Sequence, residues 1–273
     1  MTTITAKVIL ASKHPCGGKP LYTLQLRYPL IIHAEFMTHR VFSRNSASNR
    51  AIPVRKLIEE VVSDPFIPLE WGKNIAGMSA IEEVDDTESC KRAWLHARDN
   101  AVESATRLVG LGLHKQVVNR IIMPFQHINT IVTATEWDNF FSLRLQPDVE
   151  PHMRRLALAI EKAINEAEYC KNTGYSWHTP YVTNEESFSL QRTTTNNISA
   201  ARCARVSYNT HDNQTPNQSD DIYLANKLKL SGHLTPFEHQ ARWGEPDEYY
   251  SNFKGWISAR HEKEHFDYPE REI

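Results

Sequence analysis

Alternating apolar and polar side chains predict two strands near the N-terminus, at residues 4–12 and 20–28. The second is the clearer, because alternate positions of PLYTLQLRY fall into two different faces. The HPCGGKP segment between them is rich in glycine and proline and is typical of a turn. A third stretch, HINTIVTAT at residues 127–135, is β-branched and predicts another strand.

Apolar residues at helical spacing predict the helices. The stripe between Glu88 and Leu111 predicts a long core helix, and the next helix is expected to end before Pro124. The last helix is closed by Gly232. The expected helices are 53–64, 88–111, 114–123, 136–145, 150–170 and 220–233. Strands and helices together indicate an α+β protein.

Polar segments separate these elements and predict loops. Residues 172–200 and 209–220 are rich in Asn, Thr, Ser and Asp, which favour turns over regular elements. For the acidic and aromatic tail within 240–273 we expect a plain surface helix with a frayed end. Internal repeats and low-complexity tracts are absent from the sequence.

Composition narrows the class of protein. The 273 residues are 40% hydrophobic and 23% charged, as in an ordinary globular protein, and the net charge of -2 argues against a general nucleic-acid binder. The four cysteines are far apart, so we expect reduced thiols in a cytoplasmic protein. Without a long apolar run, neither secretion nor membrane insertion is expected.

Several common enzyme signatures are missing. The sequence contains no GxGxxG, GxxxxGK[ST] or GxSxG motif, which argues against the usual dinucleotide, P-loop and hydrolase classes. Thirteen histidines suggest a metal, but pairs such as His233 and His239 lack a ligand set at recognised spacing. We therefore expect no metal site.

The segment THRVFSRNSASNR, residues 38–50, has an unusual concentration of positive charge. Arg40, Arg44 and Arg50 are interleaved with serine hydroxyls and asparagine amides, which are neutral hydrogen-bond donors. This loop is compatible either with a phosphate-binding cradle or with a solvated surface. Ser48 has no nearby base in a recognisable triad order, so donation to a phosphate suits it better than nucleophilic attack.

Two further polar clusters follow later in the chain. NFFSLR contains Asn139 and Arg144, which by themselves are compatible with a helix-surface pair. SGHLTPFEHQ contains Glu238 and His239, which could simply cap a helix or turn. Arg120 is expected on the polar side of its helix, facing either a ligand or water.

Taken together, these clusters resemble the flavin-dependent thymidylate synthases, the ThyX family. The family signature is Arg-His-Arg, seven residues and then Ser, and here Thr38, His39, Arg40 and Ser48 have the same spacing with Thr in the first place. NFFSLR resembles the family's NFLxLR, NRIIMP its ARxxLP, ARVSY at 204–208 its ARVS, and GHLTPFEH its GHxTPFEH. The resemblance covers about two thirds of the chain.

The order of these segments differs from that of the family. The ARVS and TPFEH segments usually precede the Arg-His-Arg signature, whereas here they lie at about residues 200–240, after NFFSLR. The chain therefore resembles a circularly permuted member. Permutation is tolerated where the original ends are close together at the surface. It predicts that Ser207 and His233 contact the same ligand as His39.

The resemblance implies a single catalytic domain over residues 1–273, with a mixed or antiparallel sheet and long helices, assembled as a homotetramer. It implies FAD bound between subunits with dUMP lying on the flavin. The implied reaction converts dUMP to dTMP with methylenetetrahydrofolate as carbon donor and NADPH as reductant. Neither nucleic acid nor membrane is expected as a partner.

The resemblance also assigns roles to individual residues. Arg144 would contact and polarise the uracil ring, and Ser48 would hold the phosphate; these two are the expected catalytic residues. The residues expected to bind dUMP are Glu35, Ser48, Asn49, Arg50, Arg120 and Arg144. The residues expected to bind FAD are His39, Arg40, Asn45, Asn139, Ser207, His233, Thr235 and Glu238.

Several positions depart from the family pattern. Thr38 replaces a cation, Ser46 stands where Glu is usual, and Glu35 stands where Gln is common. Thr133 and Thr135 occupy positions where Asn and Arg bind flavin. Losing one charge-assisted contact costs about 1.5 to 3 kcal/mol, unless Arg44 substitutes for the missing arginine.

These departures leave two other functions open. An altered pocket that admits water to a methylene intermediate would hydroxymethylate a pyrimidine nucleotide with the same flavin and folate. A protein that has lost the flavin altogether would be a catalytically silent nucleotide-binding protein.

Overall fold

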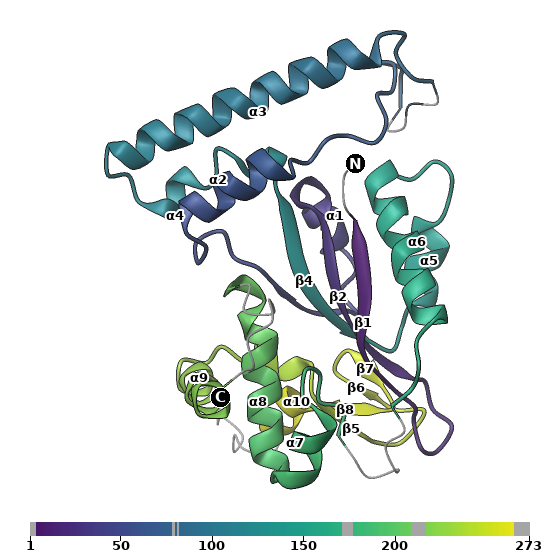
Figure 1. Ribbon diagram of the computed structural model, residues 1–273. Coiled ribbons are helices and arrows are strands. Elements are labelled where there is room, and N and C mark those ends of the chain that lie inside the picture. The colour runs from purple at the N-terminus through teal and green to yellow at the C-terminus, as the bar shows by residue number, and fades with distance from the viewer. Residues whose placement is uncertain (1–3, 78–79, 81, 171–176, 209–216, 265–273) are drawn as a thin grey trace, which may run out of the picture.

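The structure is a computed structural model that describes residues 4–77, 80, 82–170, 177–208 and 217–264. A central sheet lies between a helical arm at one end and a C-terminal layer at the other (Figure 1). Among the described residues, no helix is long and apolar enough to cross a membrane. The mixed α/β architecture with antiparallel sheets agrees with the expected fold class.

The central sheet contains the three predicted strands and one that was not predicted. Its order is β1-β2-β4-β3, all antiparallel, with β1 at Thr5–Ser12, β2 at Leu21–Pro29 and β4 at His127–Ala134. The loop prediction for 38–50 is wrong in part, because Ser43–Ser46 form β3 against β4. Backbone pairing with the buried strand β4 compensates for the low strand propensity of these polar residues.

One face of the sheet carries the main hydrophobic core. Helices α5 (Asp138–Arg144) and α6 (Pro151–Asn165) lie on this side, with the short η1 (Leu30–Ile32) and α1 (His33–Phe36) (Figure 1). The Glu150 side chain caps α6 by accepting from the Met153 amide, and Met153, Leu156 and Ile160 are fully buried. Each such side chain contributes about 1.5 to 3 kcal/mol through burial.

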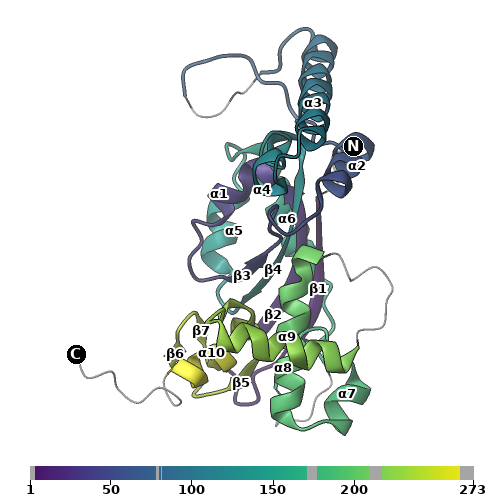
Figure 2. The same ribbon diagram turned by 90° about the vertical axis from the view of Figure 1, so that its left-hand side faces the viewer.

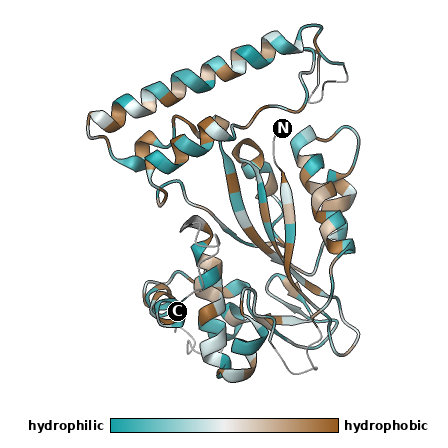
Figure 3. Cartoon of the chain, viewed as in Figure 1, coloured by the Kyte–Doolittle hydropathy of each residue, from teal (hydrophilic) through white to brown (hydrophobic). Residues whose placement is uncertain are grey.

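The helical arm consists of α2 (Val54–Ser63), α3 (Thr87–Gly110), α4 (Lys115–Val118) and η2 (Met123–Phe125). The helix at 88–111 is confirmed, but it is not a core helix, since Ala105 is its one buried residue. It stands away from the sheet (Figures 1 and 2), and hydrophilic residues recur along its length (Figure 3). The predicted helix 114–123 is wrong beyond Val118, because Asn119 turns inward to bond backbone carbonyls.

The C-terminal layer corrects two predictions. The described part of 172–200 is not a loop, because it contains α7 (Asn184–Ser189) and most of α8 (Arg192–Ala204). Small side chains such as Ala200, Ala201 and Cys203 allow α8 to pack closely. Residues 209–216 lie outside the described residues, and Gln218, predicted as loop, begins α9 (Gln218–Leu230).

The tail is also not a plain surface helix. After η3 (Arg205–Tyr208) and η4 (Thr235–Glu238), the chain forms two small hairpin sheets, which bury Phe253 and Trp256. Residues 265–273 lie outside the described residues. The elements of the tail are β5 (Ala241–Trp243), β6 (Tyr249–Tyr250), β7 (Phe253–Lys254), β8 (Trp256–Ser258) and α10 (Ala259–Glu262).

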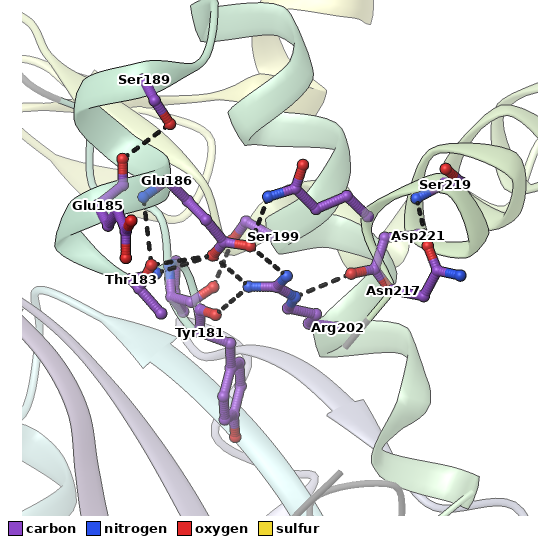
Figure 4. Close-up of polar contacts among 12 residues, drawn as sticks. Tyr181, Thr183, Glu185, Glu186, Ser189, Ser199, Arg202, Asn217, Ser219 and Asp221 are labelled. Atoms are coloured by element: carbon purple, nitrogen blue, oxygen red, sulfur yellow. Dashed lines mark hydrogen bonds and ion pairs between the residues drawn. The ribbon is translucent and has the colours of Figure 1, made fainter. Parts of the chain in front are cut away.

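A buried ionic network connects three helices of this layer (Figure 4). The Arg202 guanidinium on α8 donates to both Glu186 carboxylate oxygens of α7, at 2.7 and 2.6 Å, and to Asp221 of α9 at 2.9 Å. Arg205 pairs with the second Asp221 oxygen at 2.9 Å. Bonds from Arg202 lower the pKa of Glu186 to about 2. The network therefore fixes α8 and the start of η3 relative to α7 and α9.

Candidate functional site

The structure places His39, Arg144 and Glu35 together. Arg144, at the end of α5, donates from Nε to His39 Nε2 at 2.9 Å, and its Nη1 pairs with the Glu35 carboxylate of α1. Both guanidinium contacts hold the Arg144 side chain in one orientation. An expected uracil-contacting residue and an expected flavin-contacting residue thus touch each other.

Aromatic side chains surround His39, which is 7% exposed. The ring of Phe140 meets it edge-on at 4.9 Å between centroids, and Phe42 lies at 5.8 Å. Burial, and then the positive charges of Arg144 and Arg44, lower the pKa of His39 to about 4. His39 is therefore a neutral imidazole at neutral pH, and the charge of this cluster comes from Arg144 and Glu35.

Arg44 and Thr38 have local structural contacts. Arg44 Nη1 donates to the carbonyl oxygens of Met37 at 2.8 Å and of His39 at 3.1 Å, which ties the segment before β3 to the strand. Thr38 Oγ1 donates to the Glu35 carbonyl at 2.7 Å and closes the turn after α1. Threonine at this position therefore has a backbone-capping contact in place of the family's cation.

A second group of predicted residues lies beyond the other end of β3. Asn49 donates from Nδ2 to Gln126 Oε1 at 2.7 Å, and its carbonyl accepts from Asn119 Nδ2 at 2.6 Å. These bonds hold the Ser48–Arg50 turn against the segment that carries Arg120. Arg50 and Arg120 are exposed, and neither has an ion pair within the described parts of the chain.

Sequence reasoning missed the residues that shape this second group. Lys115 donates from Nζ to the Ala51 carbonyl at 2.9 Å, and Asn119 and Gln126 hold Asn49. Their contacts are with backbone or amide groups, which leave no spacing pattern. The one available signal was the position of Asn119 directly before Arg120 in the NRIIMP segment.

The C-terminal segments lie beside β3. Asn45 Nδ2 donates to the Cys203 carbonyl at 3.2 Å, and η3 and η4 both contact β3. Glu238 pairs with Arg260 at 2.5 Å and contributes to the electrostatic environment of Arg44. The structure therefore brings together segments that lie on either side of NFFSLR in the sequence.

The remaining predicted residues are placed less closely. His233 and Thr235 are exposed around the start of η4. Arg40, which directly follows His39 in the sequence, is also exposed, and so is Asn139 on α5. Ser207 lies on η3, but its side chain is outside the described residues. No group of three or more His, Cys, Asp or Glu that could hold a metal ion occurs in the described ranges.

The donor set suits an anionic nucleotide with an aromatic base. Arg40, Arg50 and Arg120 have exposed guanidinium groups that pair with no carboxylate among the described residues, and such groups match phosphate groups. The neutral His39 ring accepts from Arg144, and the guanidinium fixed in this way provides a cation for a polar ring. These residues therefore fit both a pyrimidine nucleotide and the phosphates of a flavin dinucleotide.

Comparisons with known proteins agree with this architecture. A family model described as "Thymidylate synthase complementing protein" matches residues 19–167. The crystal structure of the UMP/dUMP methylase PolB from Streptomyces cacaoi with 5-Br dUMP is 15% identical, with a TM-score of 0.50 over 61% of this chain and 91% of that chain. The same protein with 5-Br UMP gives 15% identity and a TM-score of 0.47, over 61% and 90%. No curated protein matches the sequence.

The structural likeness, at this identity, shows a shared fold. The family match carries more weight, since it includes β2, the His39–Arg50 segment, β4, α5 and α6. It covers more than half of the chain. The protein therefore belongs to the thymidylate synthase complementing proteins, the ThyX family of flavin-dependent thymidylate synthases.

Proposed function

We propose that the protein converts dUMP to dTMP, with methylenetetrahydrofolate as carbon donor and NADPH as reductant through bound FAD. Membership of the family supports the reaction class. The observation that carries the proposal is the Arg144 guanidinium, held between His39 and Glu35. His39 also accepts, through its carbonyl, from Arg44 of β3, which we call the cationic strand.

Arg144 acts on the pyrimidine ring. For C5 of uracil to act as a nucleophile toward the carbon donor, enolate-like negative charge must develop on the ring and its carbonyls, and a guanidinium fixed beforehand stabilises that charge without reorganising. Since His39 is neutral, it positions Arg144 without adding a second cation. Glu35 completes the alignment from the other side and restrains the guanidinium before substrate binds.

The phosphate of dUMP is held by Ser48, Asn49 and Arg50 of one subunit, together with Arg120 of a neighbouring subunit. Asn119 and Gln126 fix the Asn49 turn, so this part of the site is formed in advance. Arg50 and Arg120 supply guanidinium groups that pair with phosphate oxygens in a bidentate manner. Binding at this position orients the nucleotide relative to Arg144.

FAD, when bound, supplies the reducing equivalents for the transferred carbon. His39, Arg40, Asn45 and Asn139 would contact it from the family-matched part of the chain. Ser207, His233, Thr235 and Glu238 would contact it from the C-terminal layer, and the bond between Asn45 and Cys203 supports this assignment. The same bond supports the proposed circular permutation of the family's segment order.

The protein is proposed to act as a homotetramer. Arg40, Arg50, Arg120, Asn139, His233 and Thr235 are all exposed in the single chain, as expected of residues that complete a site with a neighbouring subunit. Arg120 is assigned to the dUMP site of a neighbour. Sedimentation of the purified protein would give the number of subunits, and a monomer that turns over dUMP would contradict a shared site.

Two measurements test the proposed reaction. The visible absorption spectrum of the purified protein is expected to show bound flavin. Incubation with dUMP, methylenetetrahydrofolate and NADPH is expected to give dTMP by mass spectrometry. Hydroxymethyl-dUMP, which contains one more oxygen, would establish the alternative reaction instead. A colourless protein that consumes no NADPH after FAD is added would contradict both and favour a silent nucleotide-binding protein.

A further inference from the structure

Five side chains form a continuous hydrogen-bonded chain through the interior, which we call the hydroxyl–imidazole chain: Ser12, His178, Thr23, Thr133 and His239. Ser12 Oγ lies 2.8 Å from His178 Nδ1, and His178 Nε2 lies 2.8 Å from Thr23 Oγ1. Thr23 Oγ1 lies 2.6 Å from Thr133 Oγ1, which lies 2.8 Å from His239 Nδ1. Every member except the half-buried Ser12 is buried.

The sheet register creates this chain. Thr23 on β2 and Thr133 on β4 are direct cross-strand neighbours, and Thr133 is also paired with Ser43 of β3. His178 reaches the sheet from a backbone bridge with Ala241, and His239 follows η4. The chain therefore runs from the end of β1 to the C-terminal segment that lies beside the cationic strand.

Burial decides the charge of the two rings. Burial lowers the pKa of His178 and the pKa of His239, each to about 3, and the nearby His239 ring lowers the pKa of His178 further. Each ring is therefore neutral at neutral pH and carries a single N–H, on either Nδ1 or Nε2.

Proton counting restricts how these N–H groups are arranged. Suppose that Thr23 donates its one proton to Thr133. His178 must then donate to Thr23 from Nε2. Thr133 is free to donate to His239 Nδ1, so the N–H of His239 is on Nε2. If the direction is reversed, both rings carry their N–H on Nδ1. The two concordant arrangements satisfy every link of the chain.

Both discordant arrangements lose a link. With Nδ1–H on His178 and Nε2–H on His239, each threonine donates to its ring, and no proton remains between two oxygens 2.6 Å apart. With Nε2–H on His178 and Nδ1–H on His239, one threonine proton has no acceptor in the chain. A buried hydroxyl without its acceptor is costly, so this arrangement is also disfavoured.

We propose that the hydroxyl–imidazole chain couples the tautomers of His178 and His239, and that His239 is thereby a positioning residue for the cofactor segment η4. His239 Nε2 is buried and has no hydrogen-bond partner among the residues that the structure describes, so it is the open end of the chain. A ligand, water or side-chain group that pairs with this nitrogen selects one direction for all the hydroxyl protons. His178 then carries its proton on the same ring nitrogen as His239.

Solution NMR of the full-length protein labelled with ¹⁵N-histidine tests the coupling at neutral pH. The ring correlations of neutral Nδ1–H and Nε2–H tautomers differ, so each histidine is classified directly. We expect His178 and His239 to share one tautomer. Thr133→Val is expected to alter the ring patterns of both histidines, although His239 is the only one of the two that Thr133 contacts directly. Thr133→Ser, which keeps the hydroxyl, is expected to restore the wild-type patterns.

Thr130→Val is the matched control, since it removes a buried hydroxyl of the same strand that bonds Tyr28 and Ser46 instead. It is expected to leave both ring patterns unchanged. Discordant tautomers in the wild-type protein would overturn the proposal, as would a Thr133→Val change confined to His239. If Thr133→Val does not fold, Thr23→Val breaks the chain at the neighbouring link; a change confined to His178, which Thr23 bonds, would then overturn the proposal.

The effect on the cofactor segment rests on the proposed function. Flavin titration is expected to show about tenfold weaker binding in Thr133→Val, equivalent to about 1.4 kcal/mol, and wild-type binding in Thr133→Ser. If the NMR experiment shows coupled tautomers but all variants bind flavin with equal affinity, the positioning role is overturned and the coupling is not. Absence of flavin binding in the wild-type protein would contradict the proposed function and leave the tautomer result standing.

Discussion

At the scale of single residues, the candidate site depends on how charges are paired. Arg144 has its partners in Glu35 and His39, whereas Arg50 and Arg120 have no ion pair within the described ranges. We therefore expect the paired and the unpaired guanidinium groups to have different functions. Arg144 is fixed by its two partners, and the proposed function assigns phosphate binding to Arg50 and Arg120.

Removing the Arg144 guanidinium is expected to lower turnover severely while flavin stays bound. In Arg144→Ala the charge beside the ring is lost, and removal of one such stabilising donor lowers kcat by about two to three decades. Steady-state turnover and the visible spectrum of the same preparation check this. Arg55→Ala, on an exposed salt bridge of α2, is the control and is expected to keep full activity. Activity of Arg144→Ala within a few-fold of wild type would contradict the assigned role.

At the scale of elements, what could be predicted depended on which force shapes the element. β1, β2, β4, α2 and α6 were predictable, because burial of one face imposes a period on their sequences. β3 and α8 were missed, because β3 is polar and is held by backbone pairing. In α8, Ser199 donates to the Pro180 carbonyl and accepts from Gln240, so its buried polar groups resemble those of a loop in the sequence.

The candidate site was predictable to a similar extent. His39, Arg144 and Asn45 could be singled out from the spacing of the family's motifs, and the structure places His39 against Arg144 and Asn45 against Cys203, while their roles stay predictions. Asn119 and Gln126 could not, since they bond a backbone carbonyl and an amide, and many sequences meet that requirement. Contacts between distant segments, such as Asn45 with Cys203, need the fold itself.

The ionic network of the C-terminal layer gives a prediction for stability. Glu186→Gln leaves the buried Arg202 with reduced compensation for its charge, and breaking a buried pair costs about 3 to 5 kcal/mol. Urea unfolding, followed by circular dichroism, measures the change in free energy. Glu59→Gln removes an exposed pair with Arg55 and is the matched control, with an expected loss below about 0.5 kcal/mol. Equal losses for the two variants would show that burial of the network has no energetic consequence.

At the scale of the whole molecule, buried histidines connect stability to pH. The pKa of His39 and of His127 is lowered to about 4, and that of His178 and of His239 to about 3, chiefly by burial. These residues lie in β4, in the segment before β3 and in the C-terminal layer. Protonation of any of them therefore acts against the packing of the sheet with its neighbours.

The fold is expected to lose stability as pH falls below about 6.5, the ordinary pKa of histidine. Between that pH and the lowered pKa, the unfolded chain binds protons that the folded chain does not. The free energy of unfolding therefore falls by up to about 1.4 kcal/mol for each histidine per unit decrease in pH. The stabilisation is complete above this range. Urea unfolding at several pH values measures the slope. His127→Gln is expected to reduce this slope by the contribution of one histidine. A free energy of unfolding that does not change between neutral pH and pH 5 would contradict the prediction.

The bond between Asn45 and Cys203 also bears on the order of folding. Its partners are separated by 158 residues, so the cationic strand acquires its C-terminal neighbour only after most of the chain has been synthesised. Contacts across so long a loop form late, because closing the loop carries an entropic cost before any contact is gained. The sheet and its helices α5 and α6 can form first from residues that are close in the chain. Docking of the C-terminal layer against β3 is therefore a late event in the folding of this protein.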